Sequence, residues 1–257
     1  LDKTASYIEK FFSDSGLPIE AWEYKVKGQN YKNILALYKN NDSQDYILIG
    51  AHYDSFFNPG ADDNASGVAG VLWLAKTLKN IKLKSNFIFV AFTNEEPPFF
   101  NTLSSGSRVF IRTARDRNIN IRNAVILESI GYYSNRWFSQ QYLPLLGPFY
   151  PNRGNFIAVV GNFQSGQLVD FIHKDFRKYK YFLSQAIKAP NEIPGINFSD
   201  HASFWEAGIP AIMITDTAFL RNSNYHSIHD TINTLDFFSM AAVMEGLKIT
   251  LVHLSEN

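Results

Sequence analysis

Acidic and histidine side chains follow three of the apolar runs that the sequence predicts to be buried strands. His52 and Asp54 come after ILIGA, Glu95 and Glu96 after FVAFTN, and Glu128 after AVIL. The carboxyl ends of parallel strands meet at one edge of a sheet, where ligands bind in such folds. We therefore expect these five side chains to lie together at that edge.

The stretch GADDNASG adds two more carboxylates, Asp62 and Asp63, in the loop that leaves the first of these strands. Taken alone, it is typical of a turn that enters a helix, with Ser66 as the N-cap. The other acids favour a second interpretation, because carboxylates at close range repel one another unless a cation neutralises them. The combination predicts a metal site. The chain has no cysteine, so His, Asp and Glu are its only strong metal ligands.

The elements that must position these side chains alternate between strands and helices. Strands are predicted over residues 19–26, 31–38, 46–50, 86–92, 123–129, 155–162 and 210–215, and helices over 1–12, 67–78, 106–116, 167–179 and 237–254. This alternation favours one α/β domain over residues 1–257, a three-layer sandwich with helices on both faces of a mostly parallel sheet. Residues 132–153, rich in aromatic residues, Pro and Asn, are predicted to form a long surface loop.

Composition limits the partners. Lys plus Arg equals Asp plus Glu at 24 each, so no basic surface indicates nucleic acid or an anionic membrane. No apolar run approaches the roughly 18 residues that span a bilayer, so no membrane-spanning segment is expected. Because the chain begins at Leu1 rather than Met, the sequence leaves room for a removed signal peptide or anchor, and so for a secreted or periplasmic location, but it does not fix the compartment. The sequence indicates no oligomeric state.

Five stretches together resemble the successive motifs of the M28-type metallopeptidases, the zinc-dependent aminopeptidases and related exopeptidases that use two co-catalytic metals. They are GAHYDS, GADDNASG, TNEEPPFF, SDHASFWEAGIPA and NYHSIHDT, between residues 46 and 231. The resemblance implies a single α/β domain with a mixed sheet and a site for two zinc ions. It also implies a cis peptide after the bridging aspartate, here between Asp63 and Asn64.

Carried over to this sequence, the resemblance implies five metal ligands, His52, Asp63, Glu96, Glu128 and His226. Asp63 resembles the carboxylate that bridges both ions. His52 and Glu128 would complete one metal position, and Glu96 and His226 would complete the other.

A second histidine, His229, competes with His226 for the last ligand position. The family pattern of Tyr-His followed by Asp-Thr fits Tyr225, His226 and Asp230, so His226 is favoured. Asp230 then resembles a carboxylate that supports His226.

Three further residues are candidates for supporting roles. Asp54, two residues after His52, resembles the acid that orients its imidazole, because a ligating histidine commonly donates its other N–H to a carboxylate. Asp200 and His201 belong to the SDH motif, which taken alone could be only a helix cap.

Glu128 departs from the family pattern, which usually has aspartate at this position. The extra methylene moves the carboxylate by roughly an ångström or more, a large shift against metal-ligand tolerances of about 0.2 Å. We therefore expect the ion held by His52 and Glu128 to be more loosely held or differently placed.

The implied activity is that of a metal-dependent exopeptidase, an aminopeptidase first, acting on peptides. Glu95 resembles the general base that takes a proton from the attacking water and delivers it to the leaving amine. Tyr225 resembles the residue whose hydroxyl stabilises the oxyanion, while a tyrosine packed in the core is an equally frequent explanation.

Three alternatives remain open. A carboxypeptidase of the same family shares the metal motifs, and no cluster of arginines near them marks a site for a C-terminal carboxylate. A glutaminyl cyclase looks like the same fold with one zinc ion but typically carries Trp where this chain has Tyr225. A binding protein that retains the fold with a damaged site is favoured only by Glu128.

Overall fold

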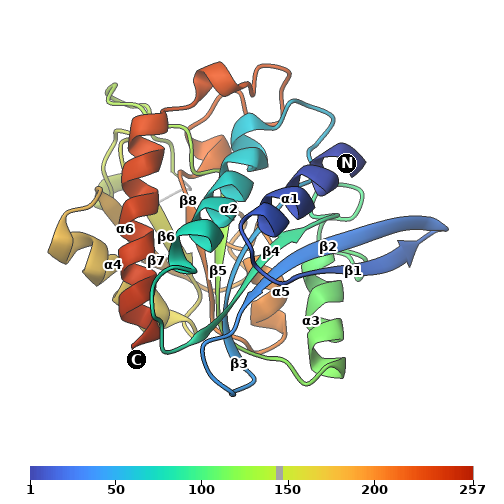
Figure 1. Cartoon of the computed structure of the whole chain (residues 1–257). Helices are drawn as coiled ribbons and strands as arrows, with labels where there is room; N and C mark the ends of the chain where they lie inside the picture. The colour runs from blue at the N-terminus through green and yellow to red at the C-terminus, as the bar shows by residue number, and fades with distance from the viewer. Residues whose placement is uncertain (143–146, 257) are drawn as a thin grey trace.

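The computed structural model describes residues 1–142 and 147–256 and shows, within them, eight strands in one mixed sheet (Figure 1). The strands lie in the order β1-β2-β4-β3-β5-β8-β6-β7. Their bounds are Ile19–Val26 (β1), Gln29–Tyr38 (β2), Asp45–His52 (β3), Asn86–Phe92 (β4), Asn120–Glu128 (β5), Ile157–Gly161 (β6), Ser184–Lys188 (β7) and Ala211–Thr215 (β8).

The centre of the sheet is parallel. β3 pairs with β4 and β5, and β5 pairs with β8, all in parallel, while β1, β2 and β6 introduce antiparallel pairings. β3 and β4 are buried along almost their whole length, which is why their sequences are unbroken apolar runs rather than alternating patterns. Because β3, β4 and β5 point the same way, their carboxyl ends share one edge, as predicted.

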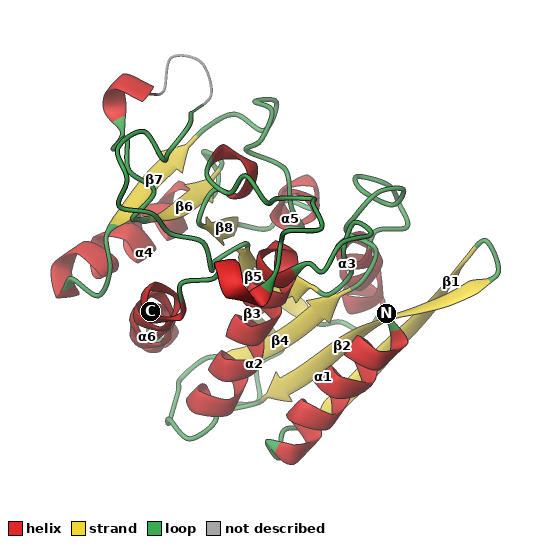
Figure 2. Ribbon diagram, turned by 90° about the horizontal axis from the view of Figure 1, so that it is seen from above, coloured by secondary structure: helices red, strands yellow, loops and turns green. Residues whose placement is uncertain are grey.

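Helices cover both faces of this sheet, which confirms the predicted α/β sandwich (Figure 2). Buried side chains of α1, α2, α4 and α6 form one core on the first face, and those of α3 and α5 join a second core on the other. The bounds are Asp2–Asp14 (α1), Gly67–Leu78 (α2), Gly106–Asp116 (α3), Gly166–Tyr179 (α4), His201–Glu206 (α5) and Phe237–Ser255 (α6).

Two short elements differ from the sequence prediction. β7 and α5 are not predicted, because β7 reads SQAIK, without an apolar run, and α5 has only six residues. The predicted surface loop over residues 132–153 is irregular apart from a short 3₁₀ helix at Gly147–Phe149, and residues 143–146 lie outside the described residues. This segment is not wholly superficial, since Gln140 is buried.

α6 is, by length and composition, long and apolar enough to cross a membrane, unlike any other helix in the described part of the chain. Its buried side chains, among them Val243, Leu247 and Leu251, pack in the core of the first face, next to α2 and α4. A helix that covers a sheet passes the same test of length and composition, so α6 is weak evidence for a membrane span.

Candidate metal centre

Asp63 lies between two histidines at the shared edge of the sheet. Its Oδ1 is 3.3 Å from Nε2 of His52, and its Oδ2 is 3.0 Å from Nε2 of His226. The bond between Asp63 and Asn64 is cis, as predicted. The side chain therefore faces the last residue of β3 on one side and a loop near residue 226 on the other.

Each side of Asp63 completes a group of three ligand atoms. Glu128, the last residue of β5, places Oε2 3.3 Å from Nε2 of His52. Glu96, four residues past the end of β4, places Oε1 3.3 Å from Nε2 of His226. In both groups the ligand atoms lie within 4.8 Å of one another, which is the arrangement that a metal ion requires.

Unpaired buried atoms provide a test of whether these groups fit a metal. Oδ2 of Asp63, Oε1 of Glu96 and Nε2 of His226 are buried and make no hydrogen bond among the described residues, although they face one another. Buried polar atoms are nearly always paired. A cation between these three atoms would satisfy them all, so the residues fit a metal.

The charges of the site point the same way. Burial, and then the carboxylates of Glu128 and other neighbouring acids, raise the pKa of Glu95 well above its usual value, against the opposing effect of His52. Burial alone would lower the pKa of His52, but the Glu128 and Glu95 carboxylates outweigh it and raise the pKa well above the ordinary value. Burial would raise the pKa of Asp63, but His226 and His52 outweigh it and lower that pKa. The buried carboxylates and histidines thus shift one another's pKa values strongly, and a bound cation would stabilise the carboxylates in their charged form.

Glu95 stands beside the ligands without belonging to either group. Its Oε2 is 3.9 Å from Nε2 of His52, and the backbone N–H groups of Glu95 and Glu96 both donate to the carboxylate of Asp54, at 3.2 and 3.0 Å. One carboxylate therefore fixes the turn that presents both glutamates.

The sequence predicts that the carboxylate of Asp54 orients His52, but in the structure the backbone oxygen of Asp54 lies closer to the imidazole than its carboxylate does. Nδ1 of His52 lies 3.1 Å from the backbone oxygen of Asp54 and 3.6 Å from its Oδ1. The closer acceptor is the carbonyl oxygen, because the carboxylate is taken up by the two N–H groups after β4. A local sequence pattern could not separate these two acceptors.

Asp230 corrects another expectation. Its carboxylate does not bond the imidazole of His226 but accepts the backbone N–H groups of Asp62 and Asp63, at 2.9 and 3.1 Å. Asp62 turns away from the ligands and accepts from the Gly131 N–H and the Asn222 side chain. The pair of acids in GADDNASG thus divides into one metal-facing and one structural carboxylate.

Ser66 does not cap α2. Its hydroxyl donates to the carbonyl of Asp62 and accepts from the N–H of Ile130, and Oδ1 of Asn64 instead accepts from the N–H of Gly67 at 3.1 Å. The hydroxyl serves the turn rather than the helix because the chain bends sharply through residues 61–66, where Asp63 and Asn64 have non-helical dihedral angles.

Two supporting residues escaped the sequence analysis. Oγ of Ser199 donates to Oε2 of Glu128 at 2.7 Å, and Oδ1 of Asn64 accepts from the N–H of Ser129 at 3.0 Å. Both residues lie inside the quoted motifs, SDH and GADDNASG, which is the signal that could have identified them. The distance from Glu128 to His52 equals that from Glu96 to His226, so the fold accommodates the longer side chain. Looser binding at Glu128 stays a prediction.

The remaining residues of SDH have different surroundings. The carboxylate of Asp200 is buried and accepts no hydrogen bond among the described residues, and burial raises its pKa to about 7. His201 donates from Nε2 to the carbonyl of Ile196 at 2.7 Å and packs edge-on against Trp205, and burial lowers its pKa to about 4. His201 therefore supports the core around α5 and belongs to neither ligand group.

His226 is held by stacking. Its ring lies between Tyr225 and Phe56, with centroids 4.0 and 4.8 Å away, and its backbone has a left-handed φ of 53°. His229 is exposed and stands in neither ligand group. Burial and then the nearby carboxylates raise the pKa of the Tyr225 hydroxyl, which keeps it a proton donor.

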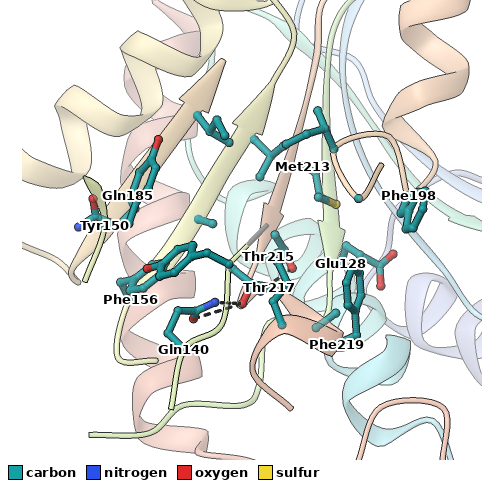
Figure 3. A pocket seen from close by; sticks show the side chains of 18 of the residues that line it. Glu128, Gln140, Tyr150, Phe156, Gln185, Phe198, Met213, Thr215, Thr217 and Phe219 are labelled. Carbon is teal, nitrogen blue, oxygen red and sulfur yellow. Dashed lines mark hydrogen bonds between the residues drawn. The ribbon is translucent and has the colours of Figure 1, made fainter. Parts of the chain in front are cut away.

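A largely apolar pocket of about 860 Å³, counting space open to solvent, begins at the metal centre. Glu128 and Tyr225 line it, together with Phe198, Met213 and Phe219 (Figure 3). The centre therefore has a charged part that suits metals and an adjoining apolar part that suits an organic group.

Comparisons with known proteins place this site in a family. The model of peptidase family M28 matches residues 33–248, and the chain belongs to this family. The Escherichia coli K12 protein YfbL is 41% identical over 266 residues, which cover 100% of this chain and 81% of YfbL. Family membership and the ligand groups make the chain a metallopeptidase, with zinc as the expected metal.

Solved structures confirm the fold. The Legionella pneumophila LapA aminopeptidase superposes with a TM-score of 0.77 at 19% identity, over 99% of this chain and 65% of LapA. A Porphyromonas gingivalis glutaminyl cyclase superposes with a TM-score of 0.73 at 19% identity, over 96% of this chain and 87% of the cyclase. Since an aminopeptidase and a cyclase share the fold, the activity must be argued from the site.

Proposed function

We propose that the chain is an aminopeptidase that uses two zinc ions to remove N-terminal residues from peptides. One observation carries the proposal: two ligand groups share Asp63, and Glu95 stands 3.9 Å from His52 without belonging to either group. A carboxylate at that position is free to move protons while the five other side chains hold metal.

When bound, zinc polarises the scissile carbonyl and lowers the pKa of water. Glu95 takes the proton from the attacking water and delivers it to the departing amine. Burial raises the pKa of Glu95, which makes its carboxylate a better proton acceptor than an exposed glutamate. The hydroxyl of Tyr225 donates to the oxyanion that forms on the substrate.

The apolar pocket supports an N-terminal residue with an apolar side chain. Phe198 and Phe219 lie at the end of the pocket nearest Glu128, where the first side chain of a peptide would enter (Figure 3). Burial of a leucine or phenylalanine side chain contributes roughly 1.5 to 3 kcal/mol. Leucyl and phenylalanyl peptides should therefore be better substrates than glycyl or glutamyl ones.

Hydrolysis of Leu-Gly-Gly by the zinc-loaded chain tests the proposal. An aminopeptidase releases leucine and Gly-Gly, whereas a carboxypeptidase releases Leu-Gly and glycine, and mass spectrometry separates these products. Gln-Ala-Ala, assayed in parallel, reports a cyclase through loss of ammonia. Formation of Leu-Gly, cyclisation without hydrolysis, or no reaction with bound zinc would each contradict the proposed activity.

A further inference from the structure

The pocket beside the metal centre continues far past the place of one side chain. It starts at Glu128 on β5 and reaches Gln185 and Ile187 on β7. In Figure 3, Glu128 lies at one end, Gln185 and Tyr150 lie at the other, and Thr215 lies between them. The pocket therefore crosses the sheet from the metal centre to the edge strand.

The strand order sets the length of this pocket. β5, β8, β6 and β7 are successive neighbours, so the pocket crosses three strand spacings. At about 4.8 Å for each spacing, this corresponds to about 14 Å. No standard apolar side chain extends that far from the backbone.

The pocket lies on the face of the sheet that carries α3 and α5, and it exists because helices cover only part of that face. α5 packs against β5 and β8, whereas the helix that packs against β6 and β7 is α4, on the opposite face. Over β6 and β7 the near face is roofed by loops that carry Tyr142, Tyr150 and Ile196. A channel remains between the sheet and these loops.

The walls of the channel suit an apolar chain rather than a peptide. The floor includes Ala158, Val160 and Met213. In the middle, Gln140 donates to Oγ1 of Thr217 at 2.8 Å and accepts from Nε of Arg221 at 2.8 Å, so the side-chain amide of Gln140 is already paired. A peptide backbone there would lose hydrogen bonds to water without replacement, at a cost that an alkyl chain does not have.

We propose that the pocket binds an unbranched acyl group of roughly ten carbon atoms, the length that matches about 14 Å of strand spacings. The protein would then hydrolyse N-acyl amides of medium-chain fatty acids. This activity rests on the proposed hydrolysis at Glu95 and extends it to a second class of substrate. One water is added across the amide: its hydroxyl goes to the acyl carbon, the C–N bond breaks, and its proton goes to the nitrogen. The products are a fatty acid and a free amine.

A series of acyl-p-nitroanilides with two to twelve carbons tests the substrate class, with leucine-p-nitroanilide as the reference for the same leaving group. We expect kcat/KM of the zinc-loaded chain to rise by about fourfold for each added methylene, the factor that burial of one CH₂ gives, up to about ten carbons, and to fall beyond that length.

Gln185→Trp, at the far end of the pocket, should lower the ratio of kcat/KM for the decanoyl substrate to that for the leucyl substrate by at least tenfold and shift the optimum to shorter chains. Ile187→Trp, on the same face of β7, is a second variant with the same expected result. Lys188→Trp is the matched control, because Lys188 pairs with Asp170 of α4 on the opposite face and should leave the ratio unchanged.

A binding measurement provides a readout that needs no catalysis. Calorimetry with decanamide and the metal-free chain should show binding that is weakened in Gln185→Trp and kept in Lys188→Trp. If the protein does not hydrolyse leucine-p-nitroanilide but hydrolyses the acyl series, the proposed aminopeptidase activity fails and the acyl pocket stands. Hydrolysis of that substrate without hydrolysis of the acyl series, a rate independent of chain length, or no binding of decanamide would overturn the acyl pocket.

Discussion

The two halves of the metal centre share Asp63 but lie in different surroundings. His52 and Glu128 are buried at strand ends, and Ser199 donates a hydrogen bond to Glu128. His226 lies outside the regular elements, with 28% of its side chain exposed, and its ring stacks on Tyr225 and Phe56 while Nε2 faces Asp63 and Glu96. One half is fixed by strands and hydrogen bonds, and the other by a loop and aromatic rings.

This difference separates two tasks of the site. The buried half is formed by the sheet itself, so its ligand positions follow from strand register. The open half faces solvent beside Tyr225, where substrate and metal can enter. We infer that the open half governs metal exchange, while the buried half holds its ligands in fixed positions beside the pocket that begins at Glu128.

The largest effect is expected at the residue that the halves share. Asp63→Ala should empty both metal positions and abolish activity, because the bridging carboxylate serves both. Glu128→Ala should remove mainly the ion of the buried half. Metal analysis by mass spectrometry of both variants checks this. Equal loss of metal from the two variants would contradict the bridging role of Asp63.

Glu95→Gln should remove activity while both ligand groups stay intact and keep their metal ions. The base is lost but no ligand is, so activity should fall by about 10² to 10⁴ with unchanged metal content. Glu96→Gln is the matched control one residue away, and it should lose the ion of the open half. Activity of Glu95→Gln within tenfold of the parent chain would remove Glu95 from the role of base.

Tyr225→Phe probes the open half through one hydroxyl. Loss of an oxyanion donor should lower kcat by about 10² to 10³, or roughly 2.7 to 4 kcal/mol, with little change in KM. Phe56→Leu removes the other ring that stacks on His226 and should have a much smaller effect. A kcat of Tyr225→Phe within tenfold of that of the parent chain would remove the hydroxyl from this role.

A gradual effect is expected from pH. Burial would lower the pKa of His226, but Asp63 and Glu96 outweigh it and raise the pKa to about 9 in the metal-free chain. Only the neutral imidazole binds metal, so below that pH binding must displace a proton. Zinc affinity of the open half should therefore rise by about tenfold per pH unit up to about 9. Titrations of Glu128→Ala in metal buffers at several pH values measure this, and a flat profile would contradict it.

Much of this organisation could be predicted from the sequence because it depends on local patterns. The buried runs of β3, β4 and β5 are strongly apolar, and parallel strands bring their ends together, so the sequence predicts the position of His52, Glu95, Glu96 and Glu128. The edge strand β7 escapes prediction because SQAIK carries no period-two alternation of apolar residues.

What the sequence cannot show is which partner each polar atom selects. The carboxylate of Asp230 bonds backbone groups 168 and 167 residues earlier, and Ser199 bonds Glu128 71 residues away. Such bonds depend on the packed fold and leave no spacing signal. For the same reason the cap expected at Ser66 falls to Asn64, whose side chain also reaches β5.

The bond between Asp230 and the N–H group of Asp63 has a consequence for the order in which the enzyme is made. The bridging aspartate leaves the ribosome 167 residues before the carboxylate that anchors its backbone. At ordinary rates of synthesis this interval lasts roughly 10 to 30 s. During that time the first ligands are already present but their loop lacks its anchor. The late segment that carries Asp230 also carries His226, so the second ligand group is complete only after that segment has been made.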